Sequence, residues 1–432
     1  MTRRADTTDA RLESWVPVAA ASDFPVQNLP FGVFVSNGRL PRIGVAIGEK
    51  LVDCYATAQA GFFEECCEPE LLQAPTLNPL LAAGCSVWAA LRERLSQLLR
   101  SDGDPRLRDA GVDRFLIERS AVEMRVPMEI GDYVDFYSSM EHATNLGRLF
   151  RPNAEALLPN WRWIPVGYHG RSSTIVIDGT PVRRPSGQRK PPDAPVPQFG
   201  PTQRLDIELE IGFVTGPGNV LGDPIDVADA REHIFGLVLV NDWSARDIQA
   251  WEYQPLGPFL GKSFATTISP WIVTLDALEP FRVEGPAQEP PPLPYLRVEE
   301  PWAYAITLAV DLQTMHMRED GLPAKTISQT TFRDMYWNVA QQLAHATVNG
   351  AIARPGDLFA SGTISGAEPA TQGSLIELAW NGERPIALSN GEKRAFLEDG
   401  DEITLRGWCE KPGARRIGFG AARGRIEPVR SS

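Results

Sequence analysis

The pattern of apolar positions changes character near residue 120. Before that point, residues 32–35 and 42–47 form short β-type runs bounded by turn residues, and residues 80–99 repeat apolar side chains at helical spacing. This part predicts two strands and one long helix, and it holds none of the motifs that carry chemistry. We therefore expect a small separate domain over residues 1–122.

The remaining residues, 123–432, contain many short apolar runs separated by glycine and proline. We expect strands at residues 173–177, 205–214, 233–240, 303–312 and 374–380, and one long helix over residues 333–348 that Gly350 ends. Strands outnumber helices in this pattern. The sequence therefore predicts a mostly β protein with some α structure, whose second domain covers residues 123–432.

Composition and charge narrow the possible partners. The chain has 432 residues, of which 43% are hydrophobic and 22% charged, as is typical of a globular protein large enough for two domains. Its net charge of −13 disfavours nucleic acid and anionic membranes as partners. No apolar run approaches the length of a membrane span, and the first residues lack the apolar core of a secretory signal.

The cysteines indicate a reducing compartment. There are five, no C-x-x-C motif occurs, and the adjacent pair Cys66 and Cys67 is poorly placed for an ordinary bridge. Reduced thiols are typical of the cytoplasm, so we expect a cytoplasmic protein.

Four carboxylates are the strongest chemical signal: Asp135, Glu208, Glu210 and Asp242. Oxygen ligands without cysteine or histidine are typical of a site for a hard cation. Glu208 and Glu210 alternate with apolar residues, so on a strand both point to the same side. A half-exposed strand with its polar face in water gives the same alternation, so this segment alone leaves both interpretations open.

Asp242 follows the apolar run 236–240, and an unpaired carboxylate buried at the end of such a strand would be costly. It is either a cation ligand or the N-cap of a following helix. If that segment is helical, Asp242 shares one face with Arg246, Gln249 and Tyr253. These three side chains suit a small anionic substrate, although a solvated helix face shows the same pattern.

His142 is the candidate general base. Ser138 and Glu141 have the spacing of a capping box, which places His142 in the first turn of a helix. The positive end of a helix disfavours imidazolium, so the neutral ring can accept a proton from water. A capped helix with an incidental histidine is the alternative. The nearby Asp135 favours the base, because one short segment then offers both an acid and a base.

Signatures of covalent and zinc chemistry are missing from the sequence. The motifs G-x-S-x-G, H-E-x-x-H and C-x-x-C do not occur. Residues 257–263 resemble a phosphate-binding loop but have three residues between the glycines instead of four. The sequence therefore points to acid–base chemistry beside a cation.

Longer blocks of sequence resemble the fumarylacetoacetate hydrolase family. They include residues 131–139 (GDYVDFYSS), 165–170 (PVGYHG), 241–249 (NDWSARDIQ), 255–264 (PLGPFLGKSF) and 361–366 (SGTISG). The resemblance is dense over residues 121–428 and looser before them. It implies a small N-terminal SH3-like β-barrel domain, followed by a catalytic domain built as a mixed β-sandwich roll. It also implies that two copies form a homodimer.

The resemblance implies an enzyme that hydrolyses a carbon–carbon bond in a 1,3-diketo acid. The reaction would convert 4-fumarylacetoacetate and water to fumarate and acetoacetate, the last step of tyrosine and phenylalanine catabolism. The four carboxylates would hold calcium. A second ion, magnesium, would be bound by Asp242, Thr266 and the backbone oxygen of Lys262.

Catalytic and substrate-binding roles also follow from the resemblance. His142 would accept a proton from water and would be paired with Glu377. Charge on the enolate leaving group would be stabilised by Arg246, Gln249 and Lys262. The carboxylates and carbonyls of the substrate would be bound by Tyr137, Arg151, Tyr168, Gln249, Tyr253 and Thr363.

Two other functions compete with this one. A related metal-dependent decarboxylase or hydratase of a 2-oxo acid would share the acidic ligands and the β-roll, but His142, Glu377 and the long N-terminal part favour the hydrolase. A non-enzymatic calcium-binding protein would need neither a base nor the Arg246 face. One departure from the family pattern is Ala265, which replaces a glycine beside Thr266 and reduces the freedom of that loop.

Overall fold

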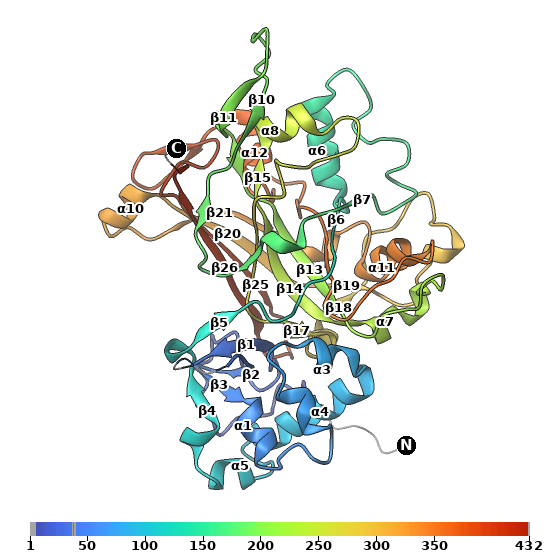
Figure 1. Cartoon of the computed structure of the whole chain (residues 1–432), viewed down its shortest axis with the longest axis vertical. Coiled ribbons are helices and arrows are strands. Elements are labelled where there is room, and N and C mark those ends of the chain that lie inside the picture. Colours follow the sequence, from blue (N-terminus) through green and yellow to red (C-terminus); the bar gives the residue numbers. More distant parts are fainter. Residues whose placement is uncertain (1–5, 37, 39, 431–432) are drawn as a thin grey trace.

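The computed structural model of the chain describes residues 6–36, 38 and 40–430, and it confirms a mostly β fold with some helix (Figure 1). Within these residues the chain forms three larger sheets, of five, eight and five strands. The first sheet and its helices lie at one end of the molecule, and the other two sheets fill the rest (Figure 1). A domain boundary at residue 122 stays a prediction.

An antiparallel five-stranded sheet in the order β4-β3-β2-β1-β5 organises the N-terminal part. Its strands are β1 (Phe31–Val35), β2 (Arg42–Ile47), β3 (Lys50–Asp53), β4 (Leu116–Glu118) and β5 (Glu123–Arg125). The accompanying helices are α1 (Cys54–Gln59), α2 (Pro69–Leu72), α3 (Asn78–Ala82), α4 (Cys85–Leu99) and α5 (Arg106–Asp109). The strands expected at residues 32–35 and 42–47 are confirmed.

The single helix expected over residues 80–99 is wrong. The chain forms α3 and then α4, with Gly84 between them at a φ of 84°. Only glycine adopts this left-handed conformation without strain, so the backbone turns there and a second helix begins.

The eight-stranded sheet carries the candidate chemistry. Its order is β7-β6-β22-β13-β14-β16-β8, and β17 also pairs with β14. These strands are β6 (Tyr133–Phe136), β7 (Gly167–His169), β8 (Ile175–Ile177), β13 (Leu209–Thr215), β14 (Ile234–Asp242), β16 (Thr266–Ile268), β17 (Val273–Thr274) and β22 (Leu358–Ala360). Segments more than 200 residues apart in sequence, such as β6 and β22, therefore become neighbours.

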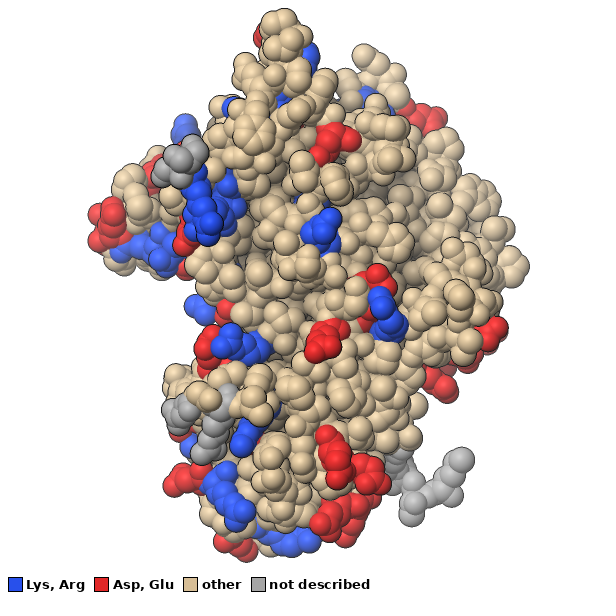
Figure 2. Space-filling model, viewed as in Figure 1, with Lys and Arg blue, Asp and Glu red and all other residues tan. Residues whose placement is uncertain are grey.

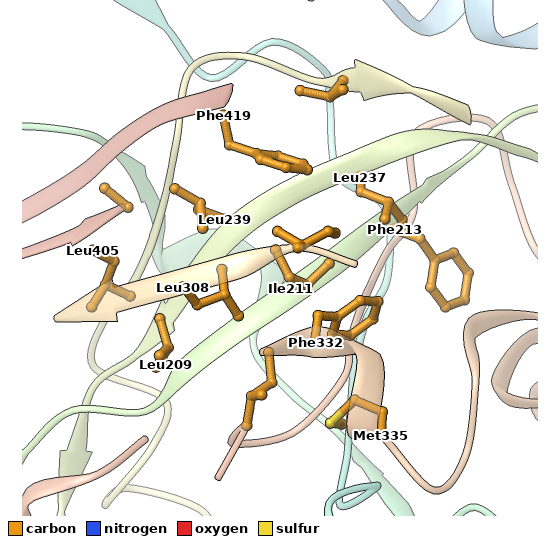
Figure 3. Close-up of a cluster of buried hydrophobic side chains, with 14 of the residues drawn as sticks. Leu209, Ile211, Phe213, Leu237, Leu239, Leu308, Phe332, Met335, Leu405 and Phe419 are labelled. Carbon is orange, nitrogen blue, oxygen red and sulfur yellow. The ribbon is translucent and has the colours of Figure 1, made fainter. Parts of the chain in front are cut away.

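A five-stranded sheet in the order β21-β20-β25-β26-β9 packs against the eight-stranded sheet. It comprises β9 (Val182–Arg183), β20 (Thr307–Gln313), β21 (Lys325–Thr331), β25 (Glu402–Cys409) and β26 (Ile417–Glu427). Between the two sheets lies a core of buried side chains (Figure 3) that includes Ile211, Phe213, Leu237, Leu239, Leu308, Leu405 and Phe419.

The other strands form short pairs: β10 (Ser186–Arg189) with β11 (Gln198–Pro201), β12 (Leu205–Asp206) with β15 (Ser244–Ala245), β18 (Arg282–Val283) with β19 (Ala303–Tyr304), and β23 (Ile386–Ala387) with β24 (Lys393–Arg394). The later helices are α6 (Met140–Phe150), α7 (Ala230–His233), α8 (Arg246–Glu252), α9 (Leu275–Leu278), α10 (Met315–Glu319), α11 (Val339–Thr347) and α12 (Leu375–Leu378).

Strand β14 is buried on both faces, which explains its unbroken apolar sequence. Leu237 and Leu239 face the core between the two sheets, whereas Val238 and Val240 belong to a second core shared with the N-terminal part. Successive side chains of a strand point to opposite faces, so a strand covered on both sides needs apolar residues throughout. The N-terminal part thus covers the outer face of the sheet that carries the site.

Phe235 lies at this junction and offers a test of it. Its ring packs edge-on against Phe31 and Trp88, with centroid distances of 5.5 and 5.1 Å. We expect Phe235→Ala to lower the free energy of unfolding by about 3–5 kcal/mol, because it leaves a cavity between the two parts. Denaturant unfolding followed by tryptophan fluorescence measures this. Val220→Ala, at a side chain 70% exposed, is the control, and equal effects of the two substitutions would contradict the shared core.

Five other expected elements need correction. The strand expected at 303–312 is interrupted between β19 and β20, and the strand expected at 173–177 begins only at Ile175 in β8. The helix expected over residues 333–348 begins only at Val339, because Asn338 caps it in a capping box with Gln341. The strand expected at 205–214 is interrupted between β12 and β13. The segment expected as a strand at 374–380 forms the short helix α12, because a carboxylate elsewhere in the fold accepts its first backbone N–H groups.

Candidate active site

The four candidate carboxylates come together at the ends of central strands of the eight-stranded sheet. Asp135 lies on β6, Glu210 on β13, Asp242 at the end of β14, and Glu208 immediately before β13. All four are at most 5% exposed. The interpretation of the 208–210 segment as a half-exposed strand is therefore wrong, because the strands and loops around it cover both of its faces.

The oxygen atoms of this cluster fit a hard cation. One carboxylate oxygen each of Asp135, Glu208 and Asp242 lies within 4.8 Å of the others. Glu210 is outside that close set, although it is fully buried beside it. Among the described residues, Oδ1 of Asp135 and Oε1 of Glu210 have no hydrogen-bond partner. Buried carboxylate oxygens without donors are typical of ligands to a divalent cation.

Two buried, positively charged side chains, Lys262 and Arg246, balance part of the negative charge of these carboxylates. The ammonium of Lys262 contacts Glu208 and lies 2.7 Å from Oδ2 of Asp242, while the Arg246 guanidinium lies 2.8 Å from Oε1 of Glu208. Burial opposes ionisation of Glu208, but Lys262 and Arg246 outweigh it and hold the pKa of this carboxyl at about 2. Glu208 is therefore a carboxylate in the folded protein.

The pKa values of Asp135 and Glu210 are raised, whereas that of Glu208 is lowered. Burial, and then the negative charge of Asp242, raises the pKa of Asp135 well above its ordinary value. Burial, and then the charge of Asp135, does the same to the pKa of Glu210. Neither carboxyl group forms an ion pair within the described part of the chain, and the more distant charge of Lys262 does not offset their burial, so both hold protons more tightly than free acids do.

These raised pKa values predict that the stabilisation of the fold by a bound metal ion depends on pH. Above the ordinary pKa values of 3.8 and 4.5, the unfolded chain releases protons that Asp135 and Glu210 keep when folded, so the metal-free protein loses stability as pH rises toward the raised values. A bound cation replaces those protons. We expect calcium to raise the melting temperature more at pH 8 than at pH 6.

Thermal unfolding with calcium chloride or chelator at both pH values measures this effect. At 100 times the dissociation constant, calcium should stabilise the fold by about 2.7 kcal/mol. Asp135→Asn removes one of the two titrating groups and should reduce the difference between the two pH values. An equal calcium shift at pH 6 and pH 8 in the unsubstituted protein would contradict the argument.

His142 lies in the first turn of α6, as expected, but the capping residue is different. Ser139, not Ser138, is the N-cap, and its Oγ accepts the backbone N–H of His142 at 3.3 Å. Ser138 instead accepts a hydrogen bond from the side chain of Gln342. Two adjacent serines leave the register of a cap ambiguous by one residue in the sequence. The expected capping box with Glu141 is therefore wrong.

The ring of His142 is paired with Glu377. Its Nδ1 lies 2.6 Å from Oε2 of Glu377, and both side chains are buried. Burial opposes ionisation of Glu377, but His142 and hydrogen bonds from neighbouring residues lower the pKa of this carboxyl. Those neighbours are Ser374 and Asn145, whose polar atoms lie 2.6 and 3.0 Å away, and Ser365 makes a further hydrogen bond to Glu377 at 2.9 Å. With Nδ1 engaged, Nε2 is the ring nitrogen left to accept a proton.

The helix after Asp242 starts later than expected. Helix α8 begins at Arg246, and its N-cap position is Ala245, so Asp242 is neither on this helix nor its cap. Arg246 and Gln249 share the inner face, where NH1 of Arg246 donates to Oε1 of Gln249 at 3.2 Å. Tyr253 follows the helix at the surface and is 39% exposed. Only part of the expected polar face therefore reaches the buried cluster.

Two other candidates hydrogen-bond to the cluster directly. Tyr168 donates to Oδ2 of Asp242 at 3.0 Å, and Thr266 donates to its Oδ1 at 2.9 Å. A cavity of 410 Å³ reaches these residues from the side of Lys262 and does not include His142 in its lining. Ala265 beside Thr266 is not among the residues with positive φ, so alanine costs no backbone strain there.

The last three candidates make no hydrogen bond to the His142–Glu377 pair or to the carboxylate cluster within the described residues. The ring of Tyr137 packs edge-on against His142 with a centroid distance of 5.2 Å. Thr363 is buried, and its hydroxyl has no partner among the described residues. Arg151 donates from NH2 to the carbonyl of Ala156 at 2.8 Å, and its Nε is buried without a described partner.

The sequence did not predict a role for Asp206 or for the hydrogen-bond partners of Glu377. Asp206 is fully buried and accepts from Nε of Arg246 at 2.7 Å. Its position was visible in the alternation, because residues 206, 208 and 210 share one parity along the chain. The partners Asn145, Ser365 and Ser374 have no such signal, because they meet Glu377 only through the tertiary fold.

The described part of the surface shown in Figure 2 carries no large patch of one charge. On the face in Figure 2, acidic and basic side chains are interspersed, and the candidate acids are buried and not part of any surface patch. No helix in the described part of the chain is both long and apolar enough to cross a membrane. The chemistry is thus concentrated inside the molecule, around a buried carboxylate cluster and a histidine–glutamate pair, an arrangement typical of a metal-dependent hydrolase.

Comparison with known proteins agrees with this class. Residues 133–427 match the family model described as fumarylacetoacetate (FAA) hydrolase C-terminal, and residues 27–127 match the one described as fumarylacetoacetase N-terminal. The fumarylacetoacetase of Homo sapiens is 51% identical over 96% of this chain and 99% of its own length. That of Arabidopsis thaliana is also 51% identical, over 97% and 99%.

A solved structure shares the fold at lower identity. The fumarylacetoacetate hydrolase of Exiguobacterium antarcticum is 17% identical and superposes with a TM-score of 0.50, covering 93% of this chain and all of that one. The chain described here belongs to the fumarylacetoacetate hydrolase family, as its sequence resemblance implied.

Proposed function

We propose that this chain is an enzyme that hydrolyses fumarylacetoacetate to fumarate and acetoacetate, the last step of tyrosine and phenylalanine catabolism. The observation that carries this proposal is the pairing of His142 with Glu377 near a buried cluster of carboxylates. The side chains of Lys262 and Arg246 supply positive charge to that cluster. The relatives that share half of its residues over nearly the whole chain bear the name fumarylacetoacetase.

His142 is the proposed general base. Glu377 holds Nδ1, so Nε2 removes a proton from water while the water oxygen adds to a carbonyl carbon of the diketone. Glu377 stabilises the imidazolium that results. The carbon–carbon bond then breaks, its electron pair leaves as the enolate of acetoacetate, and the imidazolium returns the proton to the enolate carbon. No covalent enzyme intermediate is needed.

Arg246, Gln249 and Lys262 would stabilise the developing enolate. NH2 of Arg246 is buried and has no partner among the described residues, so this donor is available to a ligand. A fixed donor in a buried site stabilises charge that develops in the transition state by about 3 kcal/mol. Tyr137, Arg151, Tyr168, Tyr253 and Thr363 are the proposed contacts to the rest of the substrate.

The carboxylate cluster is the proposed site of a divalent cation. Calcium would be held by Asp135, Glu208, Glu210 and Asp242, and magnesium by Asp242, Thr266 and the backbone oxygen of Lys262. The bound cation would polarise the diketone oxygens. The donor set supports this assignment, because it contains only oxygen atoms and includes carboxylates without other partners.

We further propose that the protein works as a homodimer in the cytoplasm. The support for a homodimer is the family resemblance. The support for the compartment is the state of its five cysteines, which are all free thiols in the fold.

The decay of the ultraviolet absorbance of fumarylacetoacetate tests this function. Purified protein should convert it to fumarate and acetoacetate, chelator should stop the reaction, and added calcium or magnesium should restore it. A protein-free sample with the same ions corrects for spontaneous hydrolysis. If a folded, calcium-loaded sample leaves the absorbance unchanged, the proposed function is wrong, and decarboxylation or hydration of a 2-oxo acid becomes the reaction to test.

A further inference from the structure

One buried carboxylate outside the cation cluster joins two parts of the site. Oδ2 of Asp206 accepts from Nε of Arg246 at 2.7 Å, and the same oxygen accepts from the backbone N–H of Ile376 at 3.1 Å. Oδ1 accepts from the N–H of Leu375 at 2.7 Å. Asp206 is fully buried. A single side chain therefore holds both a guanidinium and the first turn of α12.

Helix α12 depends on this contact because it has no side-chain cap of its own. Ser374 occupies the N-cap position but makes no capping hydrogen bond, and its hydroxyl donates to Glu377 instead. The free N–H groups at the start of a helix need an acceptor, and Asp206 supplies one from another part of the chain. Glu377 lies on this helix, so the position of its carboxylate depends on Asp206.

The same carboxylate orients Arg246. With Nε held by Asp206 and NH1 by Glu208 and Gln249, the guanidinium plane is fixed from two sides. Its NH2 group is then the donor left for a ligand. The oxygens of Asp206 already accept four hydrogen bonds, including one from the N–H of Ile207, so it is not a direct contact for substrate.

We propose that Asp206 is a positioning residue that fixes Arg246 and the His142–Glu377 pair relative to each other. This inference rests on the function proposed above. The base and the charge-stabilising guanidinium act at the two ends of one breaking bond, so an error in their separation slows the reaction even when each group is intact. A displacement of about 1 Å in such a site can cost about 100-fold in rate.

Asp206→Asn tests the link while keeping the shape of the side chain. Its amide nitrogen cannot accept a hydrogen bond, so either Arg246 or α12 loses its acceptor. We expect kcat to fall by about 100-fold with KM little changed. Asp401→Asn is the matched control, because Asp401 is also fully buried and accepts from Nε of Arg394 at 2.8 Å, but hydrogen-bonds to neither Arg246 nor α12. The control should keep the kcat of the unsubstituted enzyme.

A double-mutant cycle separates positioning from simple stabilisation of the fold. If Asp206 acts through Arg246, Asp206→Asn should slow an Arg246→Lys enzyme far less than it slows the unsubstituted enzyme. Losses that multiply would overturn the proposal. An unchanged kcat in folded Asp206→Asn would overturn it as well.

A second measurement needs neither a folded Asp206 variant nor the substrate. Arg246→Lys keeps the positive charge but loses the Nε–H that Asp206 accepts. We expect amide hydrogen exchange over residues 374–379 to become faster in this variant, because Asp206 loses the group that holds it in place. Unchanged exchange there would overturn the link between Arg246 and α12. This result is independent of whether fumarylacetoacetate is the substrate, so the two proposals can fail separately.

Discussion

His142→Ala should lower kcat by about 10²–10⁴-fold, because it removes the proposed general base. The substitution leaves the carboxylate cluster intact, since the ligand atoms that lie close enough to share a metal ion come from Asp135, Glu208 and Asp242 and not from His142. Glu377 also keeps the hydrogen bonds from Ser365, Ser374 and Asn145, so its carboxylate is not left without partners. We therefore expect a large loss of turnover with nearly unchanged calcium binding.

Steady-state kinetics and the calcium-dependent shift in melting temperature together measure this result. His316→Ala is the matched control, because His316 also pairs with a carboxylate, Glu392 at 3.0 Å, but lies on the surface. It should keep full activity. Substantial turnover by His142→Ala would exclude His142 as the base, and loss of the calcium shift would show that the histidine supports the cation site instead.

The sequence predicted the burial of Asp242 and the helical position of His142, because both residues lie where local patterns are informative. Asp242 ends a strand whose unbroken apolar run marks that strand as buried, and a buried acid needs a metal ion or a hydrogen-bond donor. His142 follows a cap signal, although two adjacent serines left its register uncertain by one residue. The general position of both residues was therefore predictable from neighbours within a few positions.

Features that depend on distant contacts were not predictable in this way. The pattern of residues 374–380 predicts a strand, but residues 375–378 form the helix α12. The helix forms because Asp206, about 170 residues earlier, accepts its first backbone N–H groups. The burial of Glu208 and Glu210 was equally hidden, because alternation gives the face of a strand and not what covers it. The cationic partners of Glu208 are likewise set by the tertiary fold.

Glu208→Ala should lower the free energy of unfolding of the protein even when no metal ion is bound. The sequence suggests that removing one acid leaves the others repelling one another, but the structure gives a different reason. Glu208 is the acid that both Lys262 and Arg246 contact, so its removal leaves two buried cations short of a partner. Breaking a buried ion pair from one side costs about 3–5 kcal/mol. The variant should also lose calcium binding and with it most of the activity.

Glu210→Gln provides the contrast that tests this reasoning, because Glu210 is a neighbouring acid that forms no ion pair with any described lysine or arginine. Burial and the charge of Asp135 raise the pKa of Glu210, so its ionisation disfavours the metal-free fold at neutral pH. We expect Glu210→Gln to weaken calcium binding while leaving the metal-free stability unchanged or higher. Denaturant unfolding of both variants in chelator at pH 7.5 gives the comparison. An equal loss of metal-free stability in the two variants would contradict the assignment of Glu208 as the acid that balances the buried cations.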